Sequence, residues 1–214
     1  MSRTITKRLN LEDTKFEYPH NFHYECRLTD ALNEKDKITN LNVLQKTFKD
    51  YIEGQEVWDF GGAGGLGYFI LKPKDTTWVV WELPPVVDYM RSKNVDEHIS
   101  FEYSQEILFP KTDKKLGLYS NGTINYLPNP LKFIKENLEN VDYMLLGGVY
   151  MGKETVLVEQ ERVGPCWIIG LNDLKKLFGD KFRVMYKDEE TPMWEVNNTD
   201  VEVYNNFDVL AIRK

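Results

Sequence analysis

Residues 56–67 read Glu-Val-Trp-Asp-Phe-Gly-Gly-Ala-Gly-Gly-Leu-Gly, a short apolar stretch followed by a turn that is mostly glycine. The apolar stretch is typical of a buried β-strand, and the run 66–71 after the turn is typical of the start of a helix. Glycine adopts positive φ and lets a ligand approach the backbone where a Cβ would block it. A turn that leads into a helix N-terminus also presents unpaired N–H groups. We therefore expect a nucleotide-like cofactor at the carboxyl end of a parallel strand.

Two cofactor fingerprints overlap in this turn. The first is the dinucleotide pattern G-x-G-x-x-G, made by Gly62, Gly64 and Gly67. The second is D-x-G-x-A-x-G, which resembles motif I of the class I methyltransferases that use S-adenosylmethionine (SAM). Its residues are Asp59, Gly61, Ala63 and Gly65. Glu82 ends the next apolar run, which suits a ribose-binding acid with either cofactor.

The charge of Asp59 distinguishes the two cofactors. A dinucleotide would place its anionic pyrophosphate over the turn, where a carboxylate at about 4 Å repels it by about 4 kcal/mol at an effective dielectric constant of roughly 20. SAM has no phosphate, and an acid attracts its ammonium and sulfonium groups. Asp59 therefore favours SAM, and a NAD-dependent oxidoreductase that uses the same turn remains the alternative.

Length and composition fit one soluble domain. The chain has 214 residues, of which 42% are hydrophobic and 29% charged, enough for a sizeable core. Its net charge of −7 argues against a nucleic acid as partner. We find no signal-peptide pattern and no apolar stretch of membrane-spanning length, so we predict a cytoplasmic protein. Cys26 and Cys166 show no metal-binding spacing, and we predict reduced thiols and no metal site.

Two segments with helical spacing precede the glycine turn. Residues 19–33 and 40–52 carry apolar residues three and four positions apart, and Gly54 ends the second segment. We predict that residues 1–54 form an N-terminal helical cap. Residues 55–214 are then expected to form one compact cofactor-binding domain.

Further strands are predicted after the glycine turn. The apolar or alternating runs that indicate them are 76–82, 99–103, 116–119, 141–149, 182–186 and 207–212. The connection between the last two runs is polar and too poor in apolar residues for a crossover helix, so we expect the last strand to be antiparallel. The predicted fold class is α/β, with a Rossmann-like seven-stranded mixed sheet and helices on both faces.

The chain from residue 56 onward resembles the class I SAM-dependent methyltransferases. Three motifs carry the resemblance: Trp-Asp-Phe-Gly-Gly-Ala-Gly-Gly at 58–65, Trp-Val-Val-Trp-Glu-Leu-Pro at 78–84, and Ser-Asn-Gly-Thr-Ile-Asn-Tyr-Leu-Pro-Asn-Pro at 120–130. In this order they are similar to the small methyltransferases of bacterial capsule and O-antigen biosynthesis gene clusters. The sequence departs from the wider family at Ala63, where a glycine is common, and at Lys115, near which many relatives carry an acid.

The resemblance implies a set of cofactor-binding residues. The turn would surround the methionine end of SAM, Glu82 would bind the ribose, residues 104–105 would lie near the adenine, and residues 120–121 would lie behind the sulfonium. The implied set is Asp59, Gly61, Gly62, Ala63, Gly65, Glu82, Leu83, Ser104, Gln105, Ser120 and Asn121.

Candidates for the acceptor side come from groups that can hold or move a proton. The candidates for a catalytic base or an acceptor-orienting group are His23, Tyr126 and Tyr150. The candidates for acceptor binding are His20, Asn125 and Arg162, the last for an anionic group. The resemblance implies methyl transfer to a sugar hydroxyl or a phosphate-like oxygen of a small carbohydrate-related molecule in surface-polysaccharide biosynthesis. A non-catalytic partner protein with the same fold is a further alternative.

Overall fold

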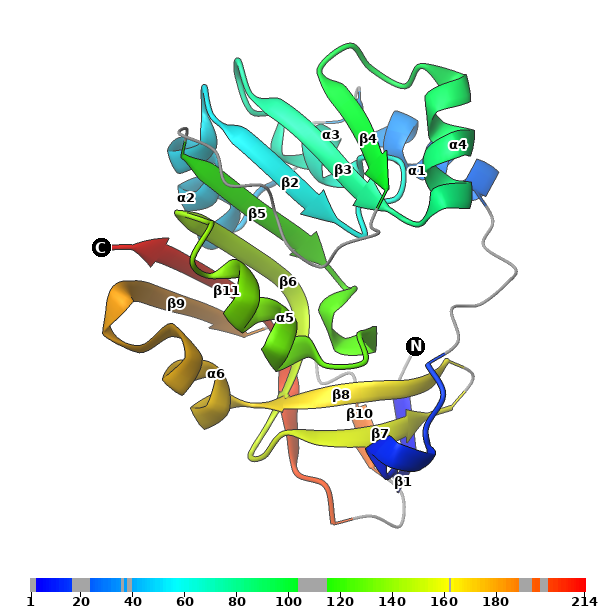
Figure 1. Cartoon of the computed structure of the whole chain (residues 1–214), viewed down its shortest axis with the longest axis vertical. Coiled ribbons are helices and arrows are strands. Elements are labelled where there is room, and N and C mark those ends of the chain that lie inside the picture. The colour runs from blue at the N-terminus through cyan, green and yellow to red at the C-terminus, as the bar shows by residue number, and fades with distance from the viewer. Residues whose placement is uncertain are drawn as a thin grey trace.

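Seven strands of the computed structural model form a mixed sheet that carries the glycine turn (Figure 1). Their order is β4 (Ile99–Tyr103), β3 (Thr77–Glu82), β2 (Glu56–Phe60), β5 (Leu116–Asn121), β6 (Tyr143–Gly152), β11 (Val203–Arg213) and β9 (Phe182–Asp188). The first five are parallel, and β11 runs antiparallel to both β6 and β9. The reversed strand near the C-terminus is therefore present. The structure describes residues 3–16, 24–35, 37, 40–103, 115–161, 163–188, 194–196 and 200–214.

Helices cover both faces of this sheet (Figure 1). One face packs against α1 (Tyr24–Lys35), α2 (Val43–Ile52), α3 (Leu66–Leu71) and α4 (Pro84–Lys93). The other packs against α5 (Pro130–Asn137) and α6 (Leu171–Phe178). Alternation along β6 explains the two cores, since Met144 and Leu146 enter one and Tyr143 and Leu145 enter the other. A strand buried on both faces reads as a continuous apolar run, as β6 does.

The helix α2 begins at a complete capping box. The side chain of Asn42 accepts hydrogen bonds from the backbone N–H groups of Leu44 and Gln45, and the Gln45 side chain accepts one from the Asn42 N–H. Its buried stripe recurs every four residues, at Leu44, Phe48 and Ile52. The cap therefore fixes where α2 starts, and the stripe fixes which side faces the sheet.

A second, smaller sheet corrects the predicted strand count. It consists of β10 (Trp194–Val196), β1 (Arg3–Arg8), β7 (Val156–Gln160) and β8 (Gly164–Gly170), and it lies below the large sheet in Figure 1. Its β8 also pairs with the end of β6, so the two sheets are continuous. The described part of the chain thus contains eleven strands, and the prediction of seven was wrong.

Two features of the sequence explain why the smaller sheet was not predicted. Residues 3–8 are mostly polar and gave no strand signal, yet their one buried side chain, Ile5, enters the small core with Val158 and Cys166. The antiparallel strands β7 and β8 form a pair in which glycine and proline interrupt the pattern of β8. Because β1 is a strand, residues 1–54 are not helical throughout, which corrects that part of the predicted cap. The domain boundary at residue 54 stays a prediction.

The described helices also bear on the predicted absence of a membrane span. None of the helices in the ranges given above is both long and apolar enough to cross a bilayer.

The buried stripe of α2 gives a test of the fold. Phe48 is fully buried, and Phe48→Ala should lower the free energy of unfolding by about 3–5 kcal/mol, because it removes a large side chain and leaves a cavity. Urea denaturation followed by circular dichroism measures the change. Val43→Ala is the matched control on the same helix, since Val43 is 63% exposed and its loss should cost less than about 0.5 kcal/mol. Equal effects of the two substitutions would contradict the packing described here.

Candidate active site

The glycine turn crosses the carboxyl end of β2 in a backbone conformation that few side chains tolerate. Gly61, Ala63 and Gly65 all have positive φ, at 68°, 50° and 80°. Gly62 is required for a different reason: a Cβ there would lie 2.3 Å from the carboxyl group of Asp59. The turn therefore lies directly against a carboxyl group, and Gly65 caps α3.

Asp59 is buried beneath this turn. Its side chain is 1% exposed, and its Oδ2 accepts a hydrogen bond of 3.0 Å from the indole Nε1 of Trp78. Its Oδ1 is buried and has no hydrogen-bond partner among the described residues. Burial raises the pKa of Asp59 to about 8, the Trp78 bond opposes the rise, and the charge of Glu82 adds to it. The site thus contains an unsatisfied acceptor that a cationic or hydrogen-bond-donating ligand would satisfy.

Glu82 joins the tip of β3 to the glycine turn. Its Oε1 accepts a hydrogen bond of 3.1 Å from the Ala63 N–H, and its Oε2 accepts one of 2.9 Å from the Leu83 N–H. Burial raises the pKa of Glu82, whereas the two backbone bonds and the charge of Arg27 lower it. Glu82 is therefore held in one orientation and still has lone pairs available for a ligand.

Ser120 and Asn121 occupy the end of β5, beside the turn. The Ser120 hydroxyl is fully buried and donates a hydrogen bond of 2.9 Å to the carbonyl oxygen of Phe60. Asn121 is exposed, and its side chain lies against Gly147 of β6. Ser120 thus ties two strand ends together, whereas Asn121 is accessible to a ligand.

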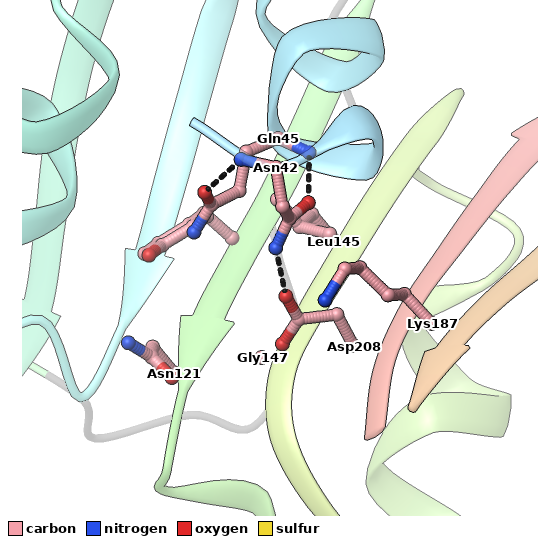
Figure 2. A pocket seen from close by; sticks show the side chains of 8 residues that line it. Asn42, Gln45, Asn121, Leu145, Gly147, Lys187 and Asp208 are labelled. Atoms are coloured by element: carbon pink, nitrogen blue, oxygen red, sulfur yellow. Dashed lines mark hydrogen bonds between the residues drawn. The ribbon is translucent and has the colours of Figure 1, made fainter. Parts of the chain in front are cut away.

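Asn121 also lines a pocket of about 240 Å³ between α2 and the strands β5, β6, β9 and β11 (Figure 2). The other lining residues are Asn42, Gln45, Tyr119, Leu145, Gly147, Lys187 and Asp208. Most of these side chains are polar. Of the residues that line the pocket, only Asn121 was predicted from the sequence to be a site residue.

Asp208 is the acid of this pocket, and two donors fix it. Its Oδ2 accepts a hydrogen bond of 2.6 Å from the Asn42 side-chain amide, and its Oδ1 accepts one of 3.2 Å from the Gly148 N–H. The strand β6 is bulged here, because Gly147 and Gly148 both lie opposite Asp208. Two adjacent glycines inside a predicted strand were the sequence signal that could have indicated this bulge.

Three predicted acceptor-side residues lie elsewhere, at the junction of the two sheets. The hydroxyl groups of Tyr126 and Tyr150 are 2.7 Å apart, and Tyr126 also bonds the Gln160 side chain at 3.3 Å. Asn125 is 1% exposed and donates a hydrogen bond of 2.7 Å to the carbonyl oxygen of Trp167. Tyr150 is 2% exposed and packs in the small core. The structure brings these residues together, but not with the pocket of Asp208, and their catalytic and binding roles stay predictions.

The remaining predicted site residues cannot be placed. His20, His23, Ser104, Gln105 and Arg162 lie outside the described residues. Within the described ranges, no group of three His, Cys, Asp or Glu side chains is arranged to hold a metal ion.

Comparison with known proteins gives matches at the level of structure. No family model and no curated protein matches the sequence. Among solved structures, the N-terminal domain of EvdMO1, determined in the presence of S-adenosylhomocysteine (SAH) and D-fucose, matches with a TM-score of 0.58 and 8% identity over 92% of this chain and 100% of that one. Magnesium protoporphyrin IX methyltransferase (ChlM) from Synechocystis PCC 6803 with bound SAH matches with a TM-score of 0.52 and 13% identity over 87% and 94%.

A third structure is the methyltransferase bound to the Trm112 activator of Haloferax volcanii, with a TM-score of 0.56 and 12% identity over 89% of this chain and 95% of that one. This chain has the fold of SAM-dependent methyltransferases. The match covers nearly the whole length of each neighbour. The predicted Rossmann-like fold is thereby confirmed. ChlM, one of these structures, was determined with bound SAH and also with bound SAM.

Burial of Asp59 predicts an unusual pH dependence of stability. A free aspartate loses its proton near pH 4, whereas Asp59 keeps it in the folded protein up to about pH 8. The folded state therefore binds the extra proton, and raising the pH from 5 to 8 favours unfolding. Asp59→Asn removes this loss of stability at rising pH. The free energy of unfolding of the variant minus that of the wild type should therefore increase from pH 5 to pH 8, by up to about 4 kcal/mol.

Chemical denaturation at several pH values measures this difference. Asp50→Asn on the exposed side of α2 is the control for the change from aspartate to asparagine. Parallel pH curves for Asp59→Asn and the wild type would show that Asp59 is already ionised near pH 5.

Proposed function

We propose that this protein is a SAM-dependent methyltransferase that methylates an oxygen of a small carbohydrate-related acceptor. The observation that carries the proposal is the buried, unsatisfied Asp59 carboxyl beneath a glycine turn that Glu82 holds in place. The methyltransferase fold supports the choice of cofactor, since the turn lies at the carboxyl ends of parallel strands.

The residues around the turn fit SAM better than a dinucleotide. The unsatisfied Oδ1 of Asp59 suits a cationic or donor group, and a cation beside Asp59 would favour its ionised form. A pyrophosphate over the same carboxyl would bring a second negative charge, which further disfavours the ionised form of Asp59, and would offer its Oδ1 no cation. Glu82 is fixed by two backbone donors and can accept hydrogen bonds from the ribose hydroxyls with its remaining lone pairs. NAD is therefore the alternative cofactor, and the calorimetric titration described below excludes or supports it.

SAM, when bound, supplies a methyl group on a positively charged sulfur, which makes that methyl reactive toward a nucleophilic oxygen. The protein then contributes mainly position. The bond from Ser120 to the Phe60 carbonyl holds the ends of β5 and β2 together, and Glu82 holds the turn. Fixing two reactants in an attack geometry can account for several kcal/mol of the activation barrier.

A carbohydrate acceptor is supported by two independent resemblances. The three motifs resemble methyltransferases of capsule and O-antigen gene clusters. The EvdMO1 domain, which shares the fold, was crystallised in the presence of SAH and D-fucose. We accordingly propose a role in surface-polysaccharide biosynthesis with a sugar hydroxyl or a phosphate-like oxygen as the methyl acceptor.

Calorimetric titration with SAH and, separately, with NAD tests the cofactor. We expect micromolar binding of SAH and none of NAD. Glu82→Gln should weaken SAH binding by about 10- to 100-fold, because it removes charged hydrogen bonds to the ligand and to the turn. Glu102→Gln, an exposed glutamate on the neighbouring β4, is the control and should bind SAH like the wild type. Binding of NAD without SAH would replace this proposal with the oxidoreductase.

A further inference from the structure

We infer that the pocket between α2 and the strands β5, β6, β9 and β11 is the acceptor site, and that Asp208 is the catalytic base. This inference rests on the proposed function and adds to it a place, a base and a class of acceptor. The acceptor is a hydroxylated ring of about monosaccharide size. The pocket measures about 240 Å³, below the ~300–1,000 Å³ of typical drug-sized ligand sites, which limits the acceptor to a small molecule.

The pocket adjoins the cofactor residues through a shared wall. Tyr119 of β5 lines the pocket and is the register partner of Asp59 on β2. The Tyr119 ring also packs against Gly67 of α3, the helix that follows the glycine turn. A Cβ added to Gly67 would lie only 2.5 Å from this ring. Asn121, two residues further along β5, lines the same pocket. A methyl group presented at the turn and an acceptor in the pocket would therefore be neighbours.

Asp208 is oriented before any ligand binds. The Asn42 amide donates a hydrogen bond to one oxygen of its carboxylate (Figure 2), and the Gly148 N–H donates to the other, so the carboxylate is held in one orientation. Each carboxylate oxygen has a further lone pair, which can accept a hydrogen bond from a ligand hydroxyl. A base that takes a proton from a hydroxyl group must be an oriented hydrogen-bond acceptor in a small polar pocket, and the Asp208 carboxylate meets this requirement.

Lys187 gives the pocket a hydrogen-bond donor next to the Asp208 carboxylate. It is the register partner of Asp208 across the antiparallel pair β9–β11, and residues directly opposite in such a pair project on the same side of the sheet. Figure 2 shows its side chain extending toward Asp208. A carboxylate, an ammonium and the Asn121 amide together match vicinal oxygens of a sugar ring. The same set accepts a neutral sugar or a uronate.

The proposed step is a direct methyl transfer. The acceptor oxygen forms a bond to the methyl carbon while the sulfur–methyl bond breaks, and its electron pair stays on sulfur. The hydroxyl proton passes to the carboxylate of Asp208. The positive charge of the sulfonium and the negative charge of the carboxylate are thereby both neutralised, so atoms and charges balance.

The test measures methyl transfer from SAM to D-fucose and to D-glucuronate, together with SAH affinity. Asp208→Asn should lower kcat by about 100-fold or more, the contribution of a general base, and should leave the Kd for SAH within threefold. Lys187→Gln should raise the KM for the sugar at least fivefold with a smaller effect on kcat. Asp188→Asn and Lys176→Gln, both exposed and outside the pocket, are the matched controls and should behave like the wild type.

SAH affinity separates the two proposals. A wild-type protein that binds SAH but methylates neither sugar, or an Asp208→Asn variant with wild-type kcat, overturns the acceptor pocket and leaves the cofactor assignment intact. A wild-type protein that does not bind SAH removes the proposed function and this inference with it. Because Asp208 contacts the cap of α2, the folding of the Asp208→Asn variant has to be checked. Retained SAH affinity shows that the variant is folded.

Discussion

The hydrogen bond from the Ala63 N–H to Glu82 joins the glycine turn, which follows β2, to β3 at the place that we propose for the cofactor. It sets the glycine turn at the tip of β3 and so holds it over the buried Asp59. The turn needs this support because it includes Ala63, a non-glycine residue at positive φ, which is a strained conformation. Glycine is required at position 62 by the Asp59 carboxyl group beneath it and at position 61 by a positive φ.

The glycine turn and the two acids beside it could be predicted from the sequence because their parts are local. Asp59, the glycines and Glu82 each belong to a strand-turn unit of a few residues, and their chemistry is legible in order along the chain. Pairing β2 with β3 in a parallel register then brings Asp59 and Glu82 to the same edge of the sheet. The methyltransferase fold followed from the same periodic strands and from the polar connection before β11.

The pocket of Asp208 could not be predicted in this way, because its parts are distant in sequence. Asn42 and Asp208 are 166 positions apart, and only the packing of α2 against β6 and β11 brings them together. The surroundings of Tyr150 could not be predicted either, because the small sheet was not predicted and its core encloses this side chain. The roles of Tyr126 and Tyr150 stay predictions.

The continuity of β6 has a consequence for how this protein can be divided. The same strand contributes Leu146 to the core of the large sheet, Gly147 to the pocket and Tyr150 to the core of the small sheet, while β11 runs alongside it. The small sheet is thus no separable module. A recombinant chimera that exchanges it for the corresponding part of another protein of this fold would have to carry β6 and β11 whole, because a junction inside either strand would alter the shape of the pocket.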